Sequence, residues 1–279
     1  MCRWLAYSGS PILLEELLYK PQHSLIDQSR HARLGVETSN GDGFGIGWYA
    51  DDLPDGTPAV FRDVSPAWND RNLRELATHV RSPLFFAHIR ASTGTPVQQT
   101  NCHPFRYDKW LWMHNGSIAQ FHQVKRDLVL DIDPALYPYI DGSTDSEVMF
   151  YLALTFGLDH DPPAAVEQMV DRVESVGRKH DVEYPIQMTV ATSDGQRLWA
   201  FRYSSQHQSR SLFYSTNVLT LRELHPEVPA LALLSEETRL VVSEPLGDLP
   251  GAWNEVPESS WGVIQEGADE MHPFMPQTA

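Results

Sequence analysis

Two cysteines occur among the 279 residues, and one of them, Cys2, directly follows the initiator methionine. A side chain as small as cysteine permits removal of Met1, so the mature chain is expected to begin at Cys2. The thiolate is the nucleophilic form of cysteine, and an α-amine with a pKa of about 7.7–8.0 can accept a proton near neutral pH. Cys2 could therefore supply both a nucleophile and its base. Its position alone also fits a small apolar residue that starts a buried strand.

Two further segments carry polar residues that suit the binding of an amide or a carboxylate. Arg90 ends an apolar run at residues 84–91 and is followed by the small polar residues Ser92 and Thr93. Arginine binds carboxylates through two parallel hydrogen bonds, although a structural ion pair is the alternative. Asn115 and Gly116 follow His114. A side-chain amide beside a glycine N–H can form an oxyanion hole, and an ordinary Asn-Gly turn is the alternative.

Asp145 stands in the first turn of an expected helix that Thr144 and Glu147 cap as a capping box. A carboxylate is favourable at a helix N-terminus, and this one could also bind an ammonium group. Plain helix capping is the alternative, and the two roles are compatible.

Other patterns indicate less chemistry. Gly43, Gly45 and Gly47 superficially suggest a dinucleotide-binding loop. They lead into an expected strand, whereas a dinucleotide-binding loop opens a helix, so close packing against another backbone is expected instead. His88, His103, His114 and Cys102 lack the usual zinc-ligand spacings, so no metal is predicted. A papain-like pair using Cys102 is disfavoured because this cysteine precedes His103-Pro104 and opens no helix.

Composition excludes several classes of function. The net charge of −16, from 37 acidic and 21 basic residues, argues against nucleic-acid binding. No stretch approaches the roughly 20 apolar residues of a membrane span, and no apolar leader follows Met1. Two cysteines do not suggest a disulfide scaffold, so a reducing cytoplasm is the expected location.

The elements expected to position these residues are strands and helices in alternation, followed by strands alone. Strands are expected at residues 3–7, 44–50, 57–62, 84–91 and 110–114. Helices are expected from Ser10-Pro11, from Ser65-Pro66 to about Val80, at 120–130, from Thr144 to Phe156 and at 162–179, with a loop-rich stretch at 20–40. Short strands then follow at 186–192, 197–203, 211–215, 230–234 and 239–243. This order predicts an α+β sandwich of two sheets with helices outside, in one domain at 2–266 with an irregular tail at 267–279.

Taken in order, the motifs resemble those of the class II (N-terminal nucleophile) glutamine amidotransferases. The matching segments are 1–7, Asp42-Gly43-Phe44-Gly45-Ile46-Gly47-Trp48, Ala87-His88-Ile89-Arg90, Cys102-His103-Pro104-Phe105, His114-Asn115-Gly116, Thr144-Asp145-Ser146-Glu147 and Ser243-Glu244-Pro245. The opening residues, the loop at 21–25 and the short length look most like the stand-alone branch, which includes the ergothioneine-pathway γ-glutamyl amidohydrolase.

The resemblance implies a four-layer αββα sandwich and a role for each site residue. Cys2 would be the nucleophile, with its own amine as base, and Asn115 and Gly116 would form the oxyanion hole. Arg90 would bind the α-carboxylate of glutamine and Asp145 its α-ammonium. Ser92 and Thr93 would lie in a loop that closes over the substrate, with His114 beside it. The family more often has tryptophan where Ala91 stands here, and no cofactor is implied.

The expected activity is cleavage of the side-chain amide of glutamine or of a γ-glutamyl compound through a Cys2 thioester. The chain would act as a hydrolase by itself or as the glutaminase subunit that supplies ammonia to a separate synthase. Two alternatives are a non-catalytic glutamine-binding module, which an intact Cys2 and Asn115 disfavour, and an acylase on a non-glutamyl amide. The acylase would not need the pair Arg90 and Asp145.

Overall fold

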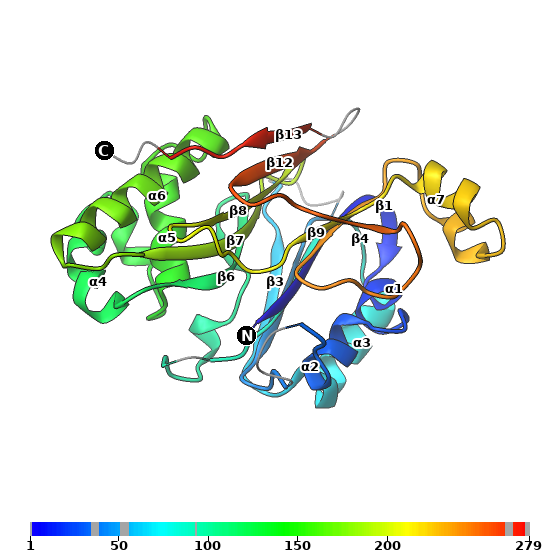
Figure 1. The fold of residues 1–279 in the computed structure, drawn as a ribbon. Coiled ribbons are helices and arrows are strands. Elements are labelled where there is room, and N and C mark those ends of the chain that lie inside the picture. The colour runs from blue at the N-terminus through cyan, green and yellow to red at the C-terminus, as the bar shows by residue number, and fades with distance from the viewer. Residues whose placement is uncertain (1, 35–38, 51–55, 93, 266–269, 277–279) are drawn as a thin grey trace.

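The structure is a computed structural model that describes residues 2–34, 39–50, 56–92, 94–265 and 270–276. Its core is two antiparallel sheets packed face to face, with helices on both outer faces (Figure 1). One sheet has the strand order β11-β9-β10-β1-β4-β2-β3 and the other has the order β13-β12-β8-β7-β6-β5. The expected α+β sandwich with four αββα layers is confirmed.

The first sheet places the two segments that carry Cys2 and Arg90 side by side. Strand β1 (Arg3–Leu13) pairs with β4 (Arg81–Ile89), and Arg3 lies opposite Ile89. The other strands of this sheet are β2 (Phe44–Trp48), β3 (Ala59–Asp63), β9 (Phe213–Ser215), β10 (Arg239–Val242) and β11 (Trp253–Glu255). Successive side chains of β1 alternate between two cores, as a strand requires: Trp4 and Ala6 face the second sheet, and Leu5 and Tyr7 face the helices.

The second sheet carries Asn115 and Gly116 on its strand β6 (Trp110–Ile118). Its other strands are β5 (Phe105–Tyr107), β7 (Ile186–Ser193), β8 (Leu198–Ser204), β12 (Ser260–Ile264) and β13 (Glu270–Pro273). The sequence predicts an irregular tail from residue 267, but β13 pairs with β12 and Phe274 is buried beyond it. The C-terminal segment therefore completes this sheet.

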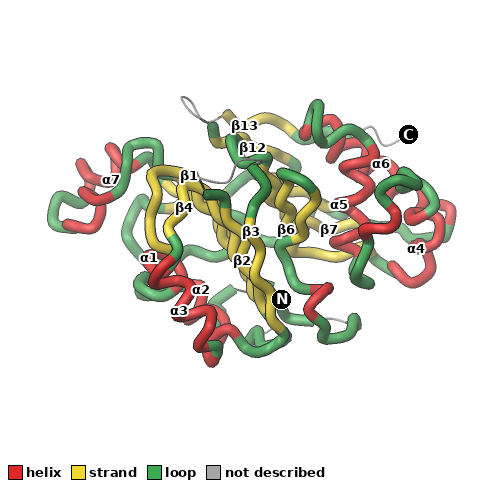
Figure 2. Tube along the Cα trace, turned by 180° about the vertical axis from the view of Figure 1, so that it is seen from behind, coloured by secondary structure: helices red, strands yellow, loops and turns green. Residues whose placement is uncertain are grey.

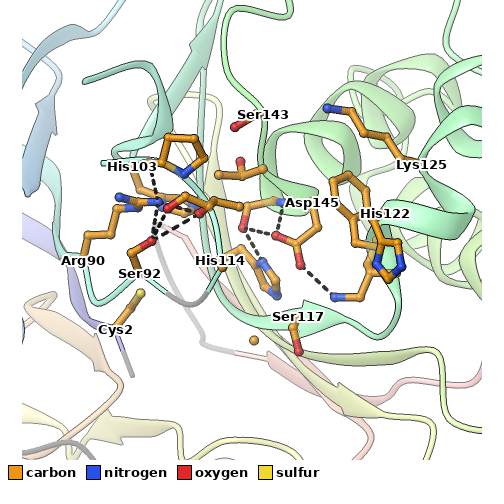
Figure 3. A pocket seen from close by; sticks show the side chains of 18 of the residues that line it. Cys2, Arg90, Ser92, His103, His114, Ser117, His122, Lys125, Ser143 and Asp145 are labelled. Carbon is orange, nitrogen blue, oxygen red and sulfur yellow. Dashed lines mark hydrogen bonds between the residues drawn. The ribbon is translucent and has the colours of Figure 1, made fainter. Parts of the chain in front are cut away.

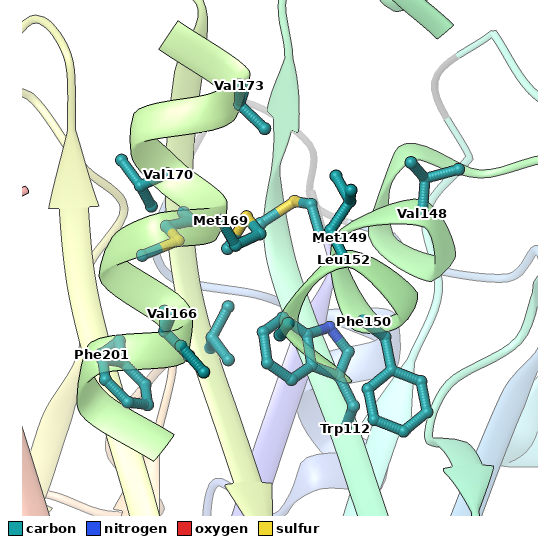
Figure 4. Packing of buried hydrophobic residues seen from close by; sticks show 14 of the residues in the cluster. Trp112, Val148, Met149, Phe150, Leu152, Val166, Met169, Val170, Val173 and Phe201 are labelled. Carbon is teal, nitrogen blue, oxygen red and sulfur yellow. The ribbon is translucent and has the colours of Figure 1, made fainter. Parts of the chain in front are cut away.

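The first sheet is covered by helices α1 (Glu15–Leu18), α2 (Leu25–Arg30) and α3 (Arg71–His79) (Figure 2). The second sheet is covered by α4 (Phe121–Val129), α5 (Asp145–Thr155) and α6 (Pro162–Lys179). The side chains of α5 from Ser146 to Ala153 are all buried, because this helix lies between the sheet and α6. Trp112 of the sheet stacks on Phe150 at 5.7 Å, and Met149 and Leu152 of α5 lie near Met169 of α6 (Figure 4). This packing fixes the N-terminus of α5, where Asp145 stands.

Three expectations about local structure are wrong. The helix expected from Ser10-Pro11 begins only at Glu15, as α1, because β1 continues to Leu13 and an irregular pairing between Ser8 and Ile12 accommodates Pro11. The strand expected at 230–234 is a short 3₁₀ helix (Pro229–Leu233) that follows helix α7 (Val218–Leu224). The helix expected from Ser65-Pro66 begins as a 3₁₀ turn (Ala67–Asn69), and α3 starts only after Asp70, whose side chain accepts a hydrogen bond from Leu73 N at 2.6 Å.

Further 3₁₀ turns lie at Gln99–Asn101 and Tyr137–Tyr139. In the part of the chain that the structure describes, no helix combines the length and the apolar character that crossing a bilayer requires.

Candidate active site

A pocket of about 540 Å³ opens where the end of β4, the end of β6 and the N-terminus of α5 meet (Figure 3). Of the predicted site residues it is lined by Cys2, Arg90, Ser92, His114, Gly116 and Asp145. Asn115 is not among the lining residues, but its side chain contacts Cys2, which is; Thr93 lies outside the described residues. Segments separated by more than 140 residues therefore converge on one cavity.

Cys2 lies just before β1 and beside the residue that follows Arg90. Its Sγ is 3.4 Å from Ala91 N and 3.6 Å from Ala91 O. Burial raises the pKa of the Cys2 thiol, and the hydrogen bond from Ala91 and the positive charge of Arg90 oppose this only in part. The thiol is therefore protonated near neutral pH, and a nucleophilic role for it requires a base.

Asn115 and Gly116 lie where β6 passes Cys2. The side-chain Nδ2 of Asn115 donates to Cys2 O at 3.0 Å. An amide nitrogen carries two N–H groups, so this contact leaves a second donor on the same atom. Gly116 has a φ of +150°, and a Cβ there would lie 1.9 Å from Gln187 O of the neighbouring strand. Only glycine fits this position, which exposes the backbone to the pocket.

Arg90 is buried, and the partners of its guanidinium among the described residues are uncharged. Its guanidinium donates to Thr95 Oγ1 at 2.6 Å, Ser92 Oγ at 3.2 Å, Pro96 O at 3.2 Å and Asp42 O at 3.3 Å. Within the described ranges no Asp or Glu oxygen lies within 4.0 Å of it, so the structural ion pair that the sequence leaves open is not found. A buried cation whose described partners are all neutral favours a negatively charged ligand in the pocket.

Asp145 connects α5 to the end of β6. Its Oδ2 accepts from Ile118 N at 2.8 Å, and its Oδ1 accepts from Ser146 N at 2.8 Å. The predicted helix cap is present, since Thr144 Oγ1 accepts from Glu147 N at 3.2 Å. Glu147, however, accepts from Asp141 N and Gly142 N at 3.0 and 2.8 Å and so fixes the preceding loop.

His114 lies deeper, with Nδ1 2.8 Å from Ser146 Oγ. Burial lowers the pKa of His114, although the charge of Asp145 acts in the opposite direction. The side chain is therefore a neutral imidazole at neutral pH, and Ser146 fixes its orientation beside Asp145.

His88 and Cys102 are buried away from the pocket, whereas His103 is one of its lining residues. His88 and His103 stack with ring centroids 4.2 Å apart, and burial lowers the pKa of His88 to about 3. Over the described residues no group of three or more His, Cys, Asp or Glu side chains is arranged to hold a metal ion. The expected close approach of the glycine strand is confirmed, because a Cβ on Gly45 would lie 2.2 Å from His103 O.

Cys102 is a poor candidate for a nucleophile. It is fully buried, does not line the pocket, and lies against the carbonyls of Asp63 and Gln98 at 3.5 and 3.7 Å. Burial raises its pKa to about 11. These contacts give it no activating histidine.

Three site features were not assigned from the sequence. Asn101 connects the two walls of the pocket: its Nδ2 donates to Pro96 O and Ser143 Oγ at 3.0 and 3.1 Å, and its Oδ1 accepts from Ser143 N at 2.8 Å. Lys125 of α4 lies on the outer wall, with its amine directed over the pocket (Figure 3). Glu244 binds Arg3 beside Cys2. Only Glu244 had a sequence signal, as part of a matching segment.

The four-layer αββα sandwich, with Cys2 directly before a central strand, is the fold of the N-terminal nucleophile hydrolases. The chain belongs to the class II glutamine amidotransferases, since the model of that family matches residues 23–278. The predicted family is therefore confirmed, and the chain is an enzyme that acts on an amide bond.

Two curated proteins align with nearly the whole chain. One is the probable glutamine amidotransferase DUG3 of Saccharomyces cerevisiae, 34% identical over 99% of this chain and 85% of that protein. The other is the γ-glutamyl-hercynylcysteine sulfoxide hydrolase of Mycolicibacterium smegmatis, 27% identical over 92% of this chain and 93% of that protein.

Solved structures agree with the fold. The glutamine aminotransferase class-II domain protein of Silicibacter pomeroyi has 34% sequence identity and a TM-score of 0.74, with 99% of each chain covered. The glutamine phosphoribosylpyrophosphate amidotransferase of B. subtilis has 16% identity and a TM-score of 0.64, over 98% of this chain and 49% of that one. The second likeness concerns the fold alone.

Proposed function

We propose that this chain cleaves the side-chain amide of glutamine or of a γ-glutamyl compound, with Cys2 as the nucleophile. The observation that carries the proposal is the presence of the Cys2 thiol, the Asn115–Gly116 donors and the pair Arg90 and Asp145 at one cavity. A glutamine-binding module would need only Arg90 and Asp145. An acylase acting on a non-glutamyl amide would need only the Cys2 thiol and the Asn115–Gly116 donors.

The reaction begins when the α-amine of Cys2, freed by removal of Met1, takes the proton of the thiol. The sulfur then attacks the carbonyl carbon of the substrate amide. The carbonyl oxygen becomes an oxyanion that accepts hydrogen bonds from Asn115 Nδ2 and Gly116 N. The ammonium formed on Cys2 protonates the departing nitrogen as the C–N bond breaks, which leaves a γ-glutamyl thioester. Water, deprotonated by the same amine, attacks the thioester and releases glutamate and the thiol.

The head group of the substrate is a zwitterion and needs two opposite charges. Arg90 would bind its α-carboxylate, exchanging some neutral partners for a charged one. Asp145 would bind its α-ammonium, because its carboxylate lies at the pocket surface and its hydrogen-bond donors among the described residues are uncharged N–H and O–H groups. The hydroxyl of Ser92 accepts a hydrogen bond from Arg90. Ser92 and Thr93 would belong to a loop that closes over the bound substrate.

For the substrate, we favour a modified γ-glutamyl compound that this chain hydrolyses alone. The pocket continues past Asp145 to α4 and leaves room beyond the head group, and the 27% identical relative is named as the hydrolase of such a compound. Supply of ammonia to a separate synthase is the second candidate, since the 34% identical relative is named as a glutamine amidotransferase. A cytoplasmic location is proposed because both cysteines are free thiols.

The nucleophile can be tested by intact-mass analysis with and without a diazoketone analogue of glutamine. The active protein should lack Met1 and gain one adduct, which peptide mapping should locate on Cys2. Cys2→Ala should abolish both the adduct and turnover, whereas Cys102→Ala should keep both. An adduct on Cys102, or full activity with Met1 retained, would refute the assignment.

The choice between the two candidates depends on turnover by the purified chain. Steady hydrolysis of a γ-glutamyl compound, faster than that of glutamine and unchanged by other proteins, supports the hydrolase. A co-purifying synthase that raises glutaminase turnover many-fold would instead support the supply of ammonia.

A further inference from the structure

The main chain of Cys2 needs support that β1 does not provide. Strand β1 begins at Arg3, so Cys2 lies outside the ladder. Once Met1 is removed, Cys2 is the terminal residue, and terminal residues are poorly ordered unless other groups hold them. Two side chains hold its carbonyl oxygen: Asn115 Nδ2 and Arg3 Nη1 each donate to it at 3.0 Å.

Arg3 is itself fixed by a carboxylate from the other end of the chain. It is 1% exposed, and its Nε donates to Glu244 Oε2 at 2.8 Å. The guanidinium also donates to Leu34 O. One planar group therefore connects the carbonyl of Cys2 with the loop that follows β10, a sequence separation of 241 residues from Arg3 to Glu244.

Glu244 is surrounded by donors and has little freedom to move. It is 2% exposed and accepts from Arg33 N at 2.8 Å, from Leu34 N at 3.0 Å and from His23 Nε2 in addition to Arg3. Burial by itself would raise the pKa of the Glu244 carboxyl, but these hydrogen bonds lower it overall. Glu244 is therefore a carboxylate throughout the neutral range.

We propose that Arg3, held by Glu244, is a positioning residue that sets the direction of the Cys2 thiol and α-amine toward the substrate amide. The inference rests on the proposed function, in which Cys2 is the nucleophile. The thiol, the amine and the carbonyl belong to one residue, so a fixed carbonyl limits rotation of the other two groups. Misplacement of a reacting atom by about 1 Å can lower a rate by about 10²-fold.

The inference predicts a loss of turnover without a matching loss of binding. Arg3→Lys keeps a cation beside Glu244, but a single ammonium lacks the planar fork that serves Glu244 and Cys2 O together. Glu244→Gln keeps the shape and removes the charge that fixes Arg3. Each variant should lower kcat by about 10- to 10²-fold and change KM by less than about threefold.

Turnover must be counted per correctly folded site. Titration of Cys2 with the diazoketone analogue gives that number, so a variant that only folds poorly would show normal turnover per titrated site. The double variant should lose about as much as one single variant, because both changes release the same group.

The matched control is Glu174→Gln. Glu174 is another buried glutamate, 4% exposed, that accepts from Tyr203 Oη at 2.6 Å and Ser205 Oγ at 3.0 Å, but it stands on α6 away from the pocket. It should lower thermal stability and leave kcat per titrated site unchanged.

Two results would overturn the inference while leaving the proposed function intact: unchanged kcat per titrated site in both Arg3→Lys and Glu244→Gln, or an equal fall in Glu174→Gln. If Cys2 of the wild-type protein takes no adduct, and the single variant Cys2→Ala stays active, the proposed function itself fails.

Discussion

Replacing Asp145 by asparagine separates the two roles of this side chain. The shape is kept, but the negative charge that we assign to the α-ammonium of the substrate is lost. Asp145 also accepts from Ile118 N and Ser146 N, each at 2.8 Å, one on each carboxylate oxygen. An asparagine has one acceptor oxygen, so one of these two backbone donors would face an NH₂ group.

The structure gives a magnitude for each role. Removal of one member of a desolvated charge pair costs about 2–5 kcal/mol. Asp145 is half-buried, so the lower end, about 2–3 kcal/mol, applies, or roughly a 30- to 150-fold weaker head-group interaction at about 1.36 kcal/mol per factor of ten. The backbone N–H without a partner should lower the free energy of unfolding by about 1–3 kcal/mol.

The assay compares kcat/KM for glutamine with kcat/KM for the same amide without its α-amino group. Asp145→Asn should lose activity on glutamine by the factor above and lose little on the second amide, because Cys2 and Asn115 are unchanged. Arg90→Ala should show the corresponding pattern with an amide that lacks only the α-carboxylate. Equal losses on both substrates of a pair would refute the reasoning and mean that the residue maintains the fold or the catalytic geometry.

Three other predictions concern separate parts of the site. Asn115→Ala should lower kcat by about 10²–10³-fold with a much smaller change in binding, and a raised KM at unchanged kcat would make Asn115 a ground-state contact. The pKa of His88 is about 3 in the fold and near 6.5 in the unfolded chain, so as the pH falls the unfolded chain takes up the proton first. Below pH 6.5 this residue should lower the free energy of unfolding, measured by urea titration, by up to about 1.4 kcal/mol per pH unit. His88→Leu should flatten that slope. Lys125 has no carboxylate within 4.0 Å among the described residues. Lys125→Gln should therefore weaken binding of γ-glutamyl compounds that carry an extra carboxylate by about two- to fivefold. The control Arg126→Gln should not weaken this binding, because Arg126 is paired with Asp127 at 3.7 Å.

Local patterns predicted those elements whose signals are local. Helix α6 begins at Pro162 and ends at Lys179 as expected, because its apolar residues recur at helical spacing and Pro162 suits a first helical position. The capping box located α5 in the same way. Ser10-Pro11 carried an equally good helix signal, yet pairing of Ile12 with Ser82 of a distant strand overrode it. Propensity is a weak preference that tertiary contacts can exceed.

The meeting of Cys2, Arg90 and Asp145 at one cavity could be expected, because each belongs to a motif at one end of its own element. Their supports could not, because these contacts join residues without a shared local pattern. Arg3 and Glu244 stand 241 positions apart, and a sequence offers many carboxylates that could pair with a given arginine. Lys125 lies one turn into α4, where a lysine is usually solvated, and only the path of the chain from β6 directs it over the pocket.

We propose that the spacing between Arg90 and Asp145 selects the ligand, and Asn101 bridges the two segments that carry them. Arg90 donates to Pro96 O, which also accepts from Asn101 Nδ2. On its other side Asn101 binds both the N–H and the hydroxyl of Ser143, two residues before Asp145. A single amide thus connects the cation of one wall with the anion of the other. Because Gly142 has no side chain, the loop approaches so closely that a Cβ there would lie 2.6 Å from Asn101 Oδ1. The two charges are therefore held at a fixed separation before any ligand arrives, which favours a compact zwitterion over a ligand with either charge alone.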